Sequence, residues 1–134
     1  MFTYKTSIRL HHTDAAGLIF FANQLVLAHD AYESLLKKMG FNYENHLLKG
    51  KYLLPIVHVE SDYKRPLFVG DEISIRVKVA RIGTTSFTLE YQFYKKQKLL
   101  VGTVQTVHVL IEKKSKKKCP LSKALRSSLE RISD

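Results

Sequence analysis

Residues 23–40 read NQLVLAHDAYESLLKKMG, and their apolar positions recur at the spacing of an α-helix. One stripe of this helix is formed by Leu25, Ala28, Tyr32, Leu35, Leu36 and Met39, and it is widened by Val26, Leu27 and Ala31. A stripe of this width predicts a deeply buried helix of about four and a half turns. Asn23 is the predicted N-cap, and Gly40 is predicted to end the helix.

The segments on both sides of this helix alternate with the period of a β-strand. Residues 2–10 alternate before it, and four further runs follow at about 53–63, 72–79, 87–93 and 99–111. The last run is apolar on both faces for much of its length, as in a central strand. Short connections at 82–84 and 95–98 suit hairpins, so we expect the four later strands to form an antiparallel meander. A short helical turn is expected at 43–48.

This order of elements predicts an α+β fold. A five-stranded antiparallel sheet needs its apolar face covered, and the sequence offers one long helix for that purpose. We therefore expect the sheet to wrap around this central helix. Open edge strands in such a sheet are usually covered, which predicts at least a dimer.

Length and composition exclude several classes of protein. A chain of 134 residues suits one domain, and its single cysteine, Cys119, excludes an internal disulfide framework and a Cys-rich zinc site. No apolar run approaches the ~20 residues of a membrane helix, and the first ten residues do not resemble a signal peptide. We expect a cytoplasmic protein.

Positive charge gathers at the C-terminal end of the chain. Residues 113–134 hold eight Lys or Arg and two acidic residues, giving +6 of the net charge of +10. We therefore divide the chain into a folded domain, 1–112, and a basic tail, 113–134, in which 121–132 has the spacing of a short helix. Such a tail is consistent with a solvated terminus or with binding of RNA, an anionic membrane or a phosphate-bearing ligand.

A carboxylate lies between the first strand and the long helix, in HHTDAAGLIFFAN (11–23). The unpaired backbone N–H groups of a helix start stabilise a negative oxygen, because the helix dipole is positive there. Asp14 next to such donors suits acyl transfer, as a base or as a nucleophile. Asp is also common in turns, so these residues alone leave open whether Asp14 is catalytic or only structural.

The run from Asp14 to Asn23 resembles the Asp-x-x-Gly-x-(Val/Ile)-(Tyr/Phe)-x-x-Asn signature of hot-dog-fold acyl-CoA thioesterases of the 4-hydroxybenzoyl-CoA thioesterase class. The order of predicted elements is similar to that family over nearly the whole chain, and Pro66 with Gly70-Asp71 resembles its Pro…Gly-Asp turn. HDAYE (29–33) and LPIVH (54–58) resemble the branch that hydrolyses 1,4-dihydroxy-2-naphthoyl-CoA in phylloquinone and menaquinone synthesis.

The resemblance implies roles for several residues of the motif. Asp14 would be the catalytic carboxylate, the backbone N–H of Phe21 would bind the thioester oxygen, and Gly17 would let the chain pass close to the acyl group. Phe20 and Asn23 would contact the substrate, which would lie between the helix and the sheet of a neighbouring subunit in a homodimer or homotetramer. Relatives often carry His or Tyr in place of Phe21 and Tyr in place of Gln24; neither departure changes Asp14 or a backbone donor, so we expect activity to be kept and the substrate preference to differ.

Other candidate residues lie outside the motif. His58 shares a strand face with Glu60 and Asp62 and is either a partner for a ring hydroxyl of the substrate or a histidine without special role. Candidates for the phosphates of CoA are Arg81, Lys64, Arg65 and the lysines that begin at Lys113. His29 and Glu33 are one helical turn apart but lack a third ligand with suitable spacing, so we expect no metal and no cofactor besides the CoA thioester substrate.

Three hypotheses follow. The favoured one is hydrolysis of an acyl-CoA, with 1,4-dihydroxy-2-naphthoyl as the acyl group. A short- or medium-chain acyl-CoA, or an acyl group on a carrier protein, is the alternative within the same enzyme class. The alternative of another class is a non-catalytic module that binds RNA or a membrane through its basic tail. Under the favoured hypothesis we expect no nucleic-acid partner.

Overall fold

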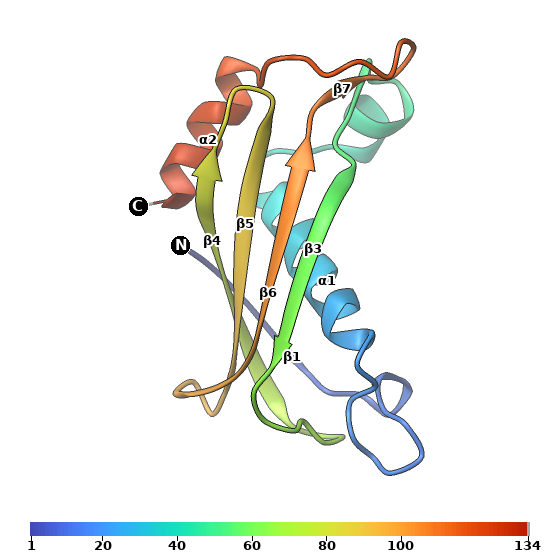
Figure 1. Cartoon of the computed structure of the whole chain (residues 1–134), viewed down its shortest axis with the longest axis vertical. Helices are drawn as coiled ribbons and strands as arrows, with labels where there is room; N and C mark the ends of the chain where they lie inside the picture. The colour runs from blue at the N-terminus through green and yellow to red at the C-terminus, as the bar shows by residue number, and fades with distance from the viewer. Residues whose placement is uncertain (134) are drawn as a thin grey trace.

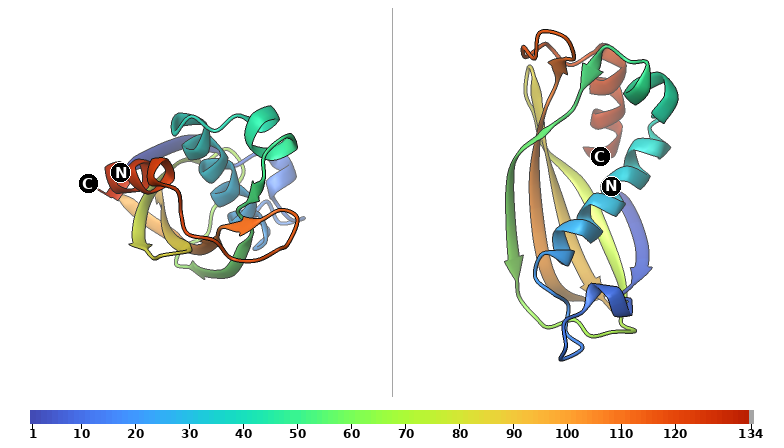
Figure 2. Two further views of the ribbon diagram at one scale, coloured as in Figure 1. Left: turned by 90° about the horizontal axis from the view of Figure 1, so that it is seen from above. Right: turned by 90° about the vertical axis from the view of Figure 1, so that its right-hand side faces the viewer.

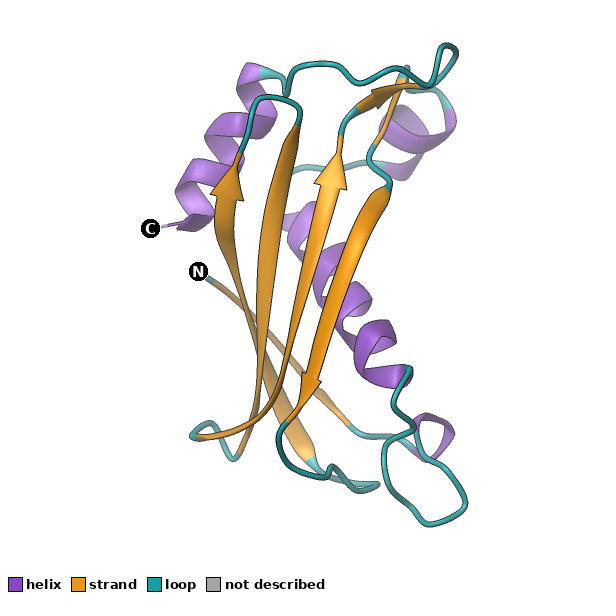
Figure 3. Ribbon diagram, in the orientation of Figure 1, coloured by secondary structure: helices purple, strands orange, loops and turns teal. Residues whose placement is uncertain are grey.

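The computed structural model describes residues 1–133 and contains a five-stranded antiparallel sheet packed against two α-helices (Figure 1; Figure 3). The elements follow in the order β1 (Phe2–Ser7), η1 (Leu10–His12), α1 (Asn23–Lys38), η2 (Tyr43–Leu48), β2 (Tyr52–Leu53), β3 (Ile56–Tyr63), β4 (Glu72–Ile82), β5 (Ser86–Lys95), β6 (Leu99–Val109), β7 (Ile111–Glu112) and α2 (Lys123–Ser133). The sheet curls around α1 (Figure 2), which confirms the predicted fold. No helix within residues 1–133 is long and apolar enough to span a membrane.

The strand order is β1-β4-β5-β6-β3, so the predicted four-strand meander is wrong at its first connection. β4, β5 and β6 do form a meander, but β3 pairs with β6, with Asp62 opposite Thr103. The connection at 64–71 crosses the end of the sheet instead of making a hairpin, and the N–H groups of Lys64 and Arg65 donate there to the carbonyl of Val101. β6 therefore lies between β5 and β3, which confirms its predicted central position.

One predicted strand is divided in two. The run at 53–63 breaks at Leu54 and Pro55: β2 pairs with β7 in a separate two-stranded sheet, and β3 begins at Ile56. Proline has no N–H to donate to a ladder, which explains the break. The predicted hairpins are present, and Lys96 and Gln97 both have positive φ, as a tight two-residue turn requires.

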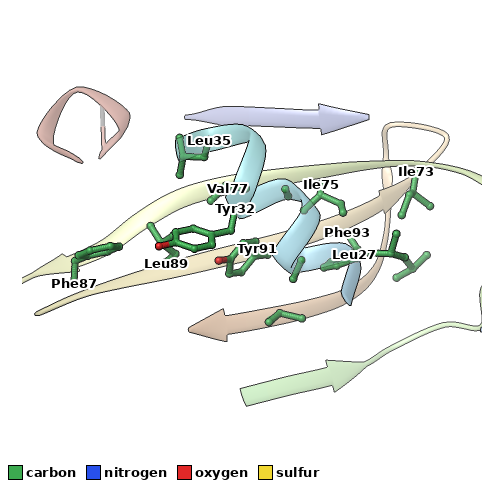
Figure 4. Packing of buried hydrophobic residues seen from close by; sticks show 14 of the residues in the cluster. Leu27, Tyr32, Leu35, Ile73, Ile75, Val77, Phe87, Leu89, Tyr91 and Phe93 are labelled. Atoms are coloured by element: carbon green, nitrogen blue, oxygen red, sulfur yellow. The ribbon is translucent and has the colours of Figure 1, made fainter. Parts of the chain in front are cut away.

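The inner face of the sheet and one face of α1 form the core of the domain (Figure 4). The buried cluster includes Leu27, Ala31, Tyr32 and Leu35 of α1 together with Ile73, Ile75 and Val77 of β4 and Phe87, Leu89, Tyr91 and Phe93 of β5. Burial of each large side chain contributes ~1.5–3 kcal/mol, so this packing fixes the position of α1 on the sheet.

The two ends of α1 differ in how well they were predicted. Gly40 ends the helix as expected: it has φ +91°, and the N–H of Phe41 donates to the carbonyl of Leu36 at 2.9 Å. The predicted N-cap role of Asn23 is wrong, because Ala22 precedes the helix without a side-chain cap and Asn23 is its first residue.

The C-terminal segment packs on the domain. α2 lies beside the upper end of β4 (Figure 1), and Leu121 and Leu129 are buried in the same cluster as α1. The lysine-rich run folds into a turn after β7, in which the N–H of Lys116 donates to the carbonyl of Glu112 and the N–H of Glu112 to the carbonyl of Lys117, both at 2.8 Å. The predicted helix in this segment is confirmed.

A buried histidine on β6 belongs to a polar network inside the core. His108 is fully buried and stacks on Phe87, with ring centroids 4.8 Å apart. Its Nε2 lies 2.7 Å from the hydroxyl of Thr106, which lies 2.9 Å from the hydroxyl of Tyr91. Its Nδ1 has no partner within residues 1–133. Burial, assisted by the nearby His29, lowers the pKa of His108 to about 4.

The network predicts a loss of stability in acid. A histidine that is neutral in the folded state binds its proton more readily when unfolded, so the free energy of unfolding should fall as the pH drops from about 6.5 to about 4. We expect a loss on the order of 3 kcal/mol, measured by urea unfolding at a fixed protein concentration. His108→Phe should flatten this slope, whereas His58→Gln, at an exposed site, should keep it. Equal slopes in wild type and His108→Phe would contradict the account.

Candidate active site

The loop that carries Asp14 joins η1 to α1 and closes on itself. Thr13 and Ile19 form a β-bridge, and the N–H of Asp14 donates to the carbonyl of Leu18 at 2.8 Å. Gly17 turns the chain with φ +78°, a backbone conformation that residues with a side chain rarely adopt. A Cβ at this position would meet no atom within 4 Å. The structure therefore requires glycine at this position for its backbone conformation rather than for space.

A second loop supports the first. Leu18 forms a bridge with Phe68, and the N–H of Ile19 donates to the carbonyl of Leu67 at 2.8 Å. The expected Pro66…Gly70-Asp71 turn is present: Gly70 has φ +89°, and a carboxylate oxygen of Asp71 accepts the N–H of Phe68 at 2.8 Å. This turn holds the Asp14 loop against the end of the sheet.

The carboxylate of Asp14 is exposed and has one oxygen engaged. Oδ1 accepts the N–H groups of Ala16 at 2.9 Å and Leu18 at 3.3 Å. Oδ2 makes no hydrogen bond to any of residues 1–133. The loop thus orients the side chain and leaves one oxygen free to act on a ligand.

Two backbone N–H groups at the start of α1 are also free. Phe21 and Ala22 donate to no group within residues 1–133, whereas the N–H of Phe20 donates to the carbonyl of His12 and the N–H of Asn23 to the carbonyl of Phe20. Both free groups lie at the positive end of the helix dipole, where a developing negative oxygen is stabilised. The sequence predicted the N–H of Phe21 as a donor to the substrate, which stays a prediction, and it did not indicate the free N–H of Ala22.

A buried amide holds this helix start against the sheet. The side chain of Gln24 is 2% exposed, and its Nε2 donates to the hydroxyl of Ser61 and the carbonyl of Asp62, both at 3.0 Å. Gly102 makes room for it, because a Cβ at that position would lie 2.5 Å from Oε1 of Gln24. Sequence reasoning missed this role, since its partners lie 37 or more residues away.

His12 lies next to the same loop and is buried. Its Nδ1 accepts the N–H of Arg9 at 2.9 Å. Burial lowers the pKa of His12, the nearby His11 and Arg9 lower it further, and Asp30 opposes them, so the net effect favours the neutral ring.

The predicted substrate-binding residues of the motif are placed differently from one another. The rings of Phe20 and Phe21 are 4.8 Å apart and exposed, Phe21 at 64%. The side-chain amide of Asn23 donates to the carbonyl of His12 at 2.8 Å, so it braces the loop. Contact of these residues with a substrate stays a prediction.

The remaining predicted residues are dispersed. His58 lies on the sheet face that points away from α1, paired with Glu60 at 3.0 Å, because Ser61, which bonds to Gln24, occupies the opposite face. Arg81 lies near the end of β4, whereas Lys64 and Arg65 begin the connection from β3 to β4, which bonds to the Asp14 loop through Leu67 and Val69 shortly before β4. The structure does not bring His58 or Arg81 to Asp14, and their roles stay predictions.

One chain does not enclose Asp14. A hollow of about 880 Å³ lies along β1 and the start of β4, lined among others by Arg9, Gly70 and Lys95, and it includes neither Asp14 nor any residue of α1. Within residues 1–133 no group of three or more His, Cys, Asp or Glu side chains is placed to hold a metal ion.

Comparisons with known proteins show the family of the chain. A family model described as the thioesterase-like superfamily matches residues 8–129. A 1,4-dihydroxy-2-naphthoyl-CoA hydrolase of Rippkaea orientalis is 36% identical over 95% of this chain and 94% of its own length. The corresponding hydrolase of Synechococcus elongatus is 32% identical over 99% of this chain and 98% of its own length.

A solved structure of a related protein has the same fold as this chain. The crystal structure of a 1,4-dihydroxy-2-naphthoyl-CoA thioesterase from Synechocystis superposes with a TM-score of 0.91 at 28% identity, covering 99% of this chain and 98% of the other. The family match, the relatives and the superposition all extend over nearly the whole chain and include the Asp14 loop. The chain therefore belongs to the thioesterase-like superfamily, as the motif from Asp14 to Asn23 predicted.

Proposed function

We propose that this thioesterase hydrolyses 1,4-dihydroxy-2-naphthoyl-CoA to the free naphthoate and CoA. The observation that carries the proposal is the free carboxylate oxygen of Asp14 in the same loop that leads to the unpaired N–H group of Phe21. The named activity of relatives that match nearly the whole chain supports the choice of acyl group.

The helix start stabilises charge on the thioester oxygen. When water or Asp14 attacks the carbonyl carbon, that carbon becomes tetrahedral and its oxygen gains negative charge. The N–H of Phe21, at the positive end of α1, donates to this oxygen and binds it more strongly as the charge grows. Because the donor is a backbone group, the Phe side chain that this sequence has in place of the His or Tyr of relatives does not remove the donor.

Asp14 supplies the carboxylate, and two routes use it. As a nucleophile, Oδ2 attacks the carbonyl carbon, the C–S bond breaks, CoA leaves as its thiol after gaining a proton, and water then hydrolyses the mixed anhydride. As a general base, Oδ2 takes a proton from water, whose oxygen attacks the same carbon; the C–S bond then breaks, and the proton held by Asp14 passes to the leaving thiolate of CoA. Both routes consume one water molecule and need the oxygen that the loop leaves free.

The acyl group is proposed to lie on the exposed rings next to the donor. Phe20 and Phe21 present aromatic surface beside the start of α1, and Val26 on the next turn is 48% exposed. A naphthalene ring would bury this apolar surface and stack on the rings. We propose that Asn23 acts on the substrate indirectly, because its side-chain amide donates to the carbonyl of His12 and braces the loop.

A second copy of the chain is proposed to complete the site. β3 is an edge strand, and its apolar Val57 and Val59 are 58% and 42% exposed. Unpaired edges of this kind associate with another strand. In a two-fold antiparallel pairing of β3 with β3, the start of one strand lies beside the end of the other, and the end of β3 contacts the helix start through Tyr63, whose hydroxyl donates to the carbonyl of Phe21. The apolar start of the second β3 would therefore cover the exposed rings.

Lys64 and Arg65 are the proposed contacts for the CoA phosphates. Both are exposed and follow Tyr63 directly, in the connection whose later residues bond to the Asp14 loop. Arg81 lies near the opposite end of the sheet within one chain, so we propose that it contacts CoA only across the antiparallel dimer.

Replacing Asp14 by Asn should abolish hydrolysis without unfolding the protein. The exposed amide removes the nucleophile or base while keeping the size of the side chain, so CoA release from 1,4-dihydroxy-2-naphthoyl-CoA should fall by ~10³-fold or more. Asp62→Asn, on the opposite face of the sheet, is the control and should retain activity. Wild-type turnover in Asp14→Asn would refute the catalytic assignment.

The acyl preference can be measured with a panel of CoA esters. If the acyl group lies on Phe20 and Phe21, kcat/KM for the dihydroxynaphthoyl ester should exceed that for hexanoyl-CoA by ~10-fold or more. Phe20→Ala should narrow this ratio, and Leu10→Ala, an exposed apolar residue outside the helix start, should not. Faster hydrolysis of aliphatic esters would keep the mechanism and reject the proposed substrate.

The edge of β3 should control assembly. Val57→Lys combined with Val59→Lys would place two charges in the proposed strand pairing, so light scattering should show a monomer, and turnover should fall at least ~10-fold. Leu99→Lys, an exposed apolar site at the start of β6, should leave both unchanged. A monomeric wild type, or a fully active monomeric variant, would show that one chain suffices.

A further inference from the structure

We infer that Tyr63 is a positioning residue of the proposed reaction and that Ala22 supplies a second donor for the thioester oxygen. The inference rests on the proposed function and extends it to a peptide group that faces the sheet. It is carried by one short hydrogen bond and by two unpaired N–H groups.

Tyr63 reaches the helix start from the last residue of β3. It lies opposite Gly102 of β6, on the same face of the sheet as Ser61, and therefore points toward α1. Its hydroxyl donates to the carbonyl oxygen of Phe21 at 2.7 Å. The ring is 47% exposed, so the side chain contributes little to the buried core.

The accepting carbonyl and the free N–H of Ala22 belong to the same peptide unit. A hydrogen bond to the carbonyl oxygen draws electron density from the peptide nitrogen and strengthens the N–H as a donor. The same bond fixes the rotation of that peptide plane. Tyr63 thus both aims and polarises the N–H of Ala22, which lies next to the N–H of Phe21 in the chain.

Other contacts at the helix start do not replace this bond. Gln24 holds the first turn through its side chain, and its own N–H reaches the carbonyl of Phe21 only at 3.4 Å. Asn23 donates to His12 on the other side of the loop. These bonds place the helix, whereas the bond from Tyr63 acts on the peptide between the two proposed donors.

Tyr63→Phe tests the inference because it removes only the hydroxyl. Loss of one donor from a site of this kind lowers kcat by ~10²–10³-fold, so removing the support of one donor should lower the single-turnover rate by ~10-fold. KM should change less than about two-fold, because the ground-state carbonyl carries little charge. Tyr94→Phe is the matched control: its hydroxyl donates to Gln92 at 3.4 Å on the opposite face, and its rate should be that of wild type.

A spectroscopic readout separates positioning from a loss of structure. In the Asp14→Asn protein, the carbonyl of bound ¹³C-labelled dihydroxynaphthoyl-CoA should absorb at lower wavenumber than in water, because two N–H groups donate to it. Adding Tyr63→Phe should return the band part of the way to its position in water, whereas adding Tyr94→Phe should not.

A backbone substitution tests Ala22 directly. Replacing Ala22 by lactate converts its amide to an ester and removes the N–H, so the rate should fall by at least as much as in Tyr63→Phe. Tyr63→Phe should then cause no further loss, since both changes act on one donor.

The outcomes distinguish the two levels of the account. No hydrolysis by wild type, or full activity in Asp14→Asn, rejects the proposed function. Hydrolysis by wild type that is unchanged in Tyr63→Phe overturns the inference alone. A slower Tyr63→Phe with an unshifted carbonyl band, or with losses that add to those of the lactate variant, also overturns it.

Discussion

Packing of one face of α1 against the inner face of the sheet is the interaction on which the rest of the structure depends. Leu27, Ala31 and Leu35 are buried against β4 and β5, and a shift of the helix along its axis would expose them. At ~1.5–3 kcal/mol for each large side chain, such a shift is too costly to occur. The start of α1 is consequently held at the end of the sheet, beside the loop that carries Asp14.

The site that results is built mostly from backbone. The proposed donors are N–H groups, and backbone N–H groups also orient the Asp14 carboxylate. Side chains act mainly by holding this backbone in place, as Gln24 does through its contacts with β3. A site of this kind tolerates a change of side chain at Phe21, while it depends on Gly17 for its turn and on Gly102 for space.

The features that could be predicted from sequence are local ones. Periodicity located α1 and the strands, and the spacing from Asp14 to Asn23 indicated the family and a candidate for the catalytic carboxylate. The pairing of β3 with β6 could not be predicted, because alternation identifies the face of a strand but not its neighbour. The N-cap prediction failed for a related reason: the amide of Asn23 bonds to His12, eleven residues earlier, instead of to the helix. The contact of Tyr63 with the helix start could not be predicted either, because its partner is a backbone carbonyl 42 residues away in the sequence.

Two features of the sequence, the lysine-rich segment and the valines of β3, could be interpreted only from the structure. The lysine-rich segment was separated from the domain by composition, yet its turn is tied to β7, and the helix that follows contributes Leu129 to the core. Conversely, Val57 and Val59 alternate like core residues but remain exposed on an edge strand. Their exposure, together with an open Asp14, is what favours a site shared by two chains.

The most direct test of the central claim is a crystal structure of the Asp14→Asn protein with 1,4-dihydroxy-2-naphthoyl-CoA bound. The account predicts the thioester oxygen within hydrogen-bond distance of the N–H of Phe21, with the carbonyl carbon facing residue 14. A thioester bound elsewhere, for example in the hollow along β1, would contradict it.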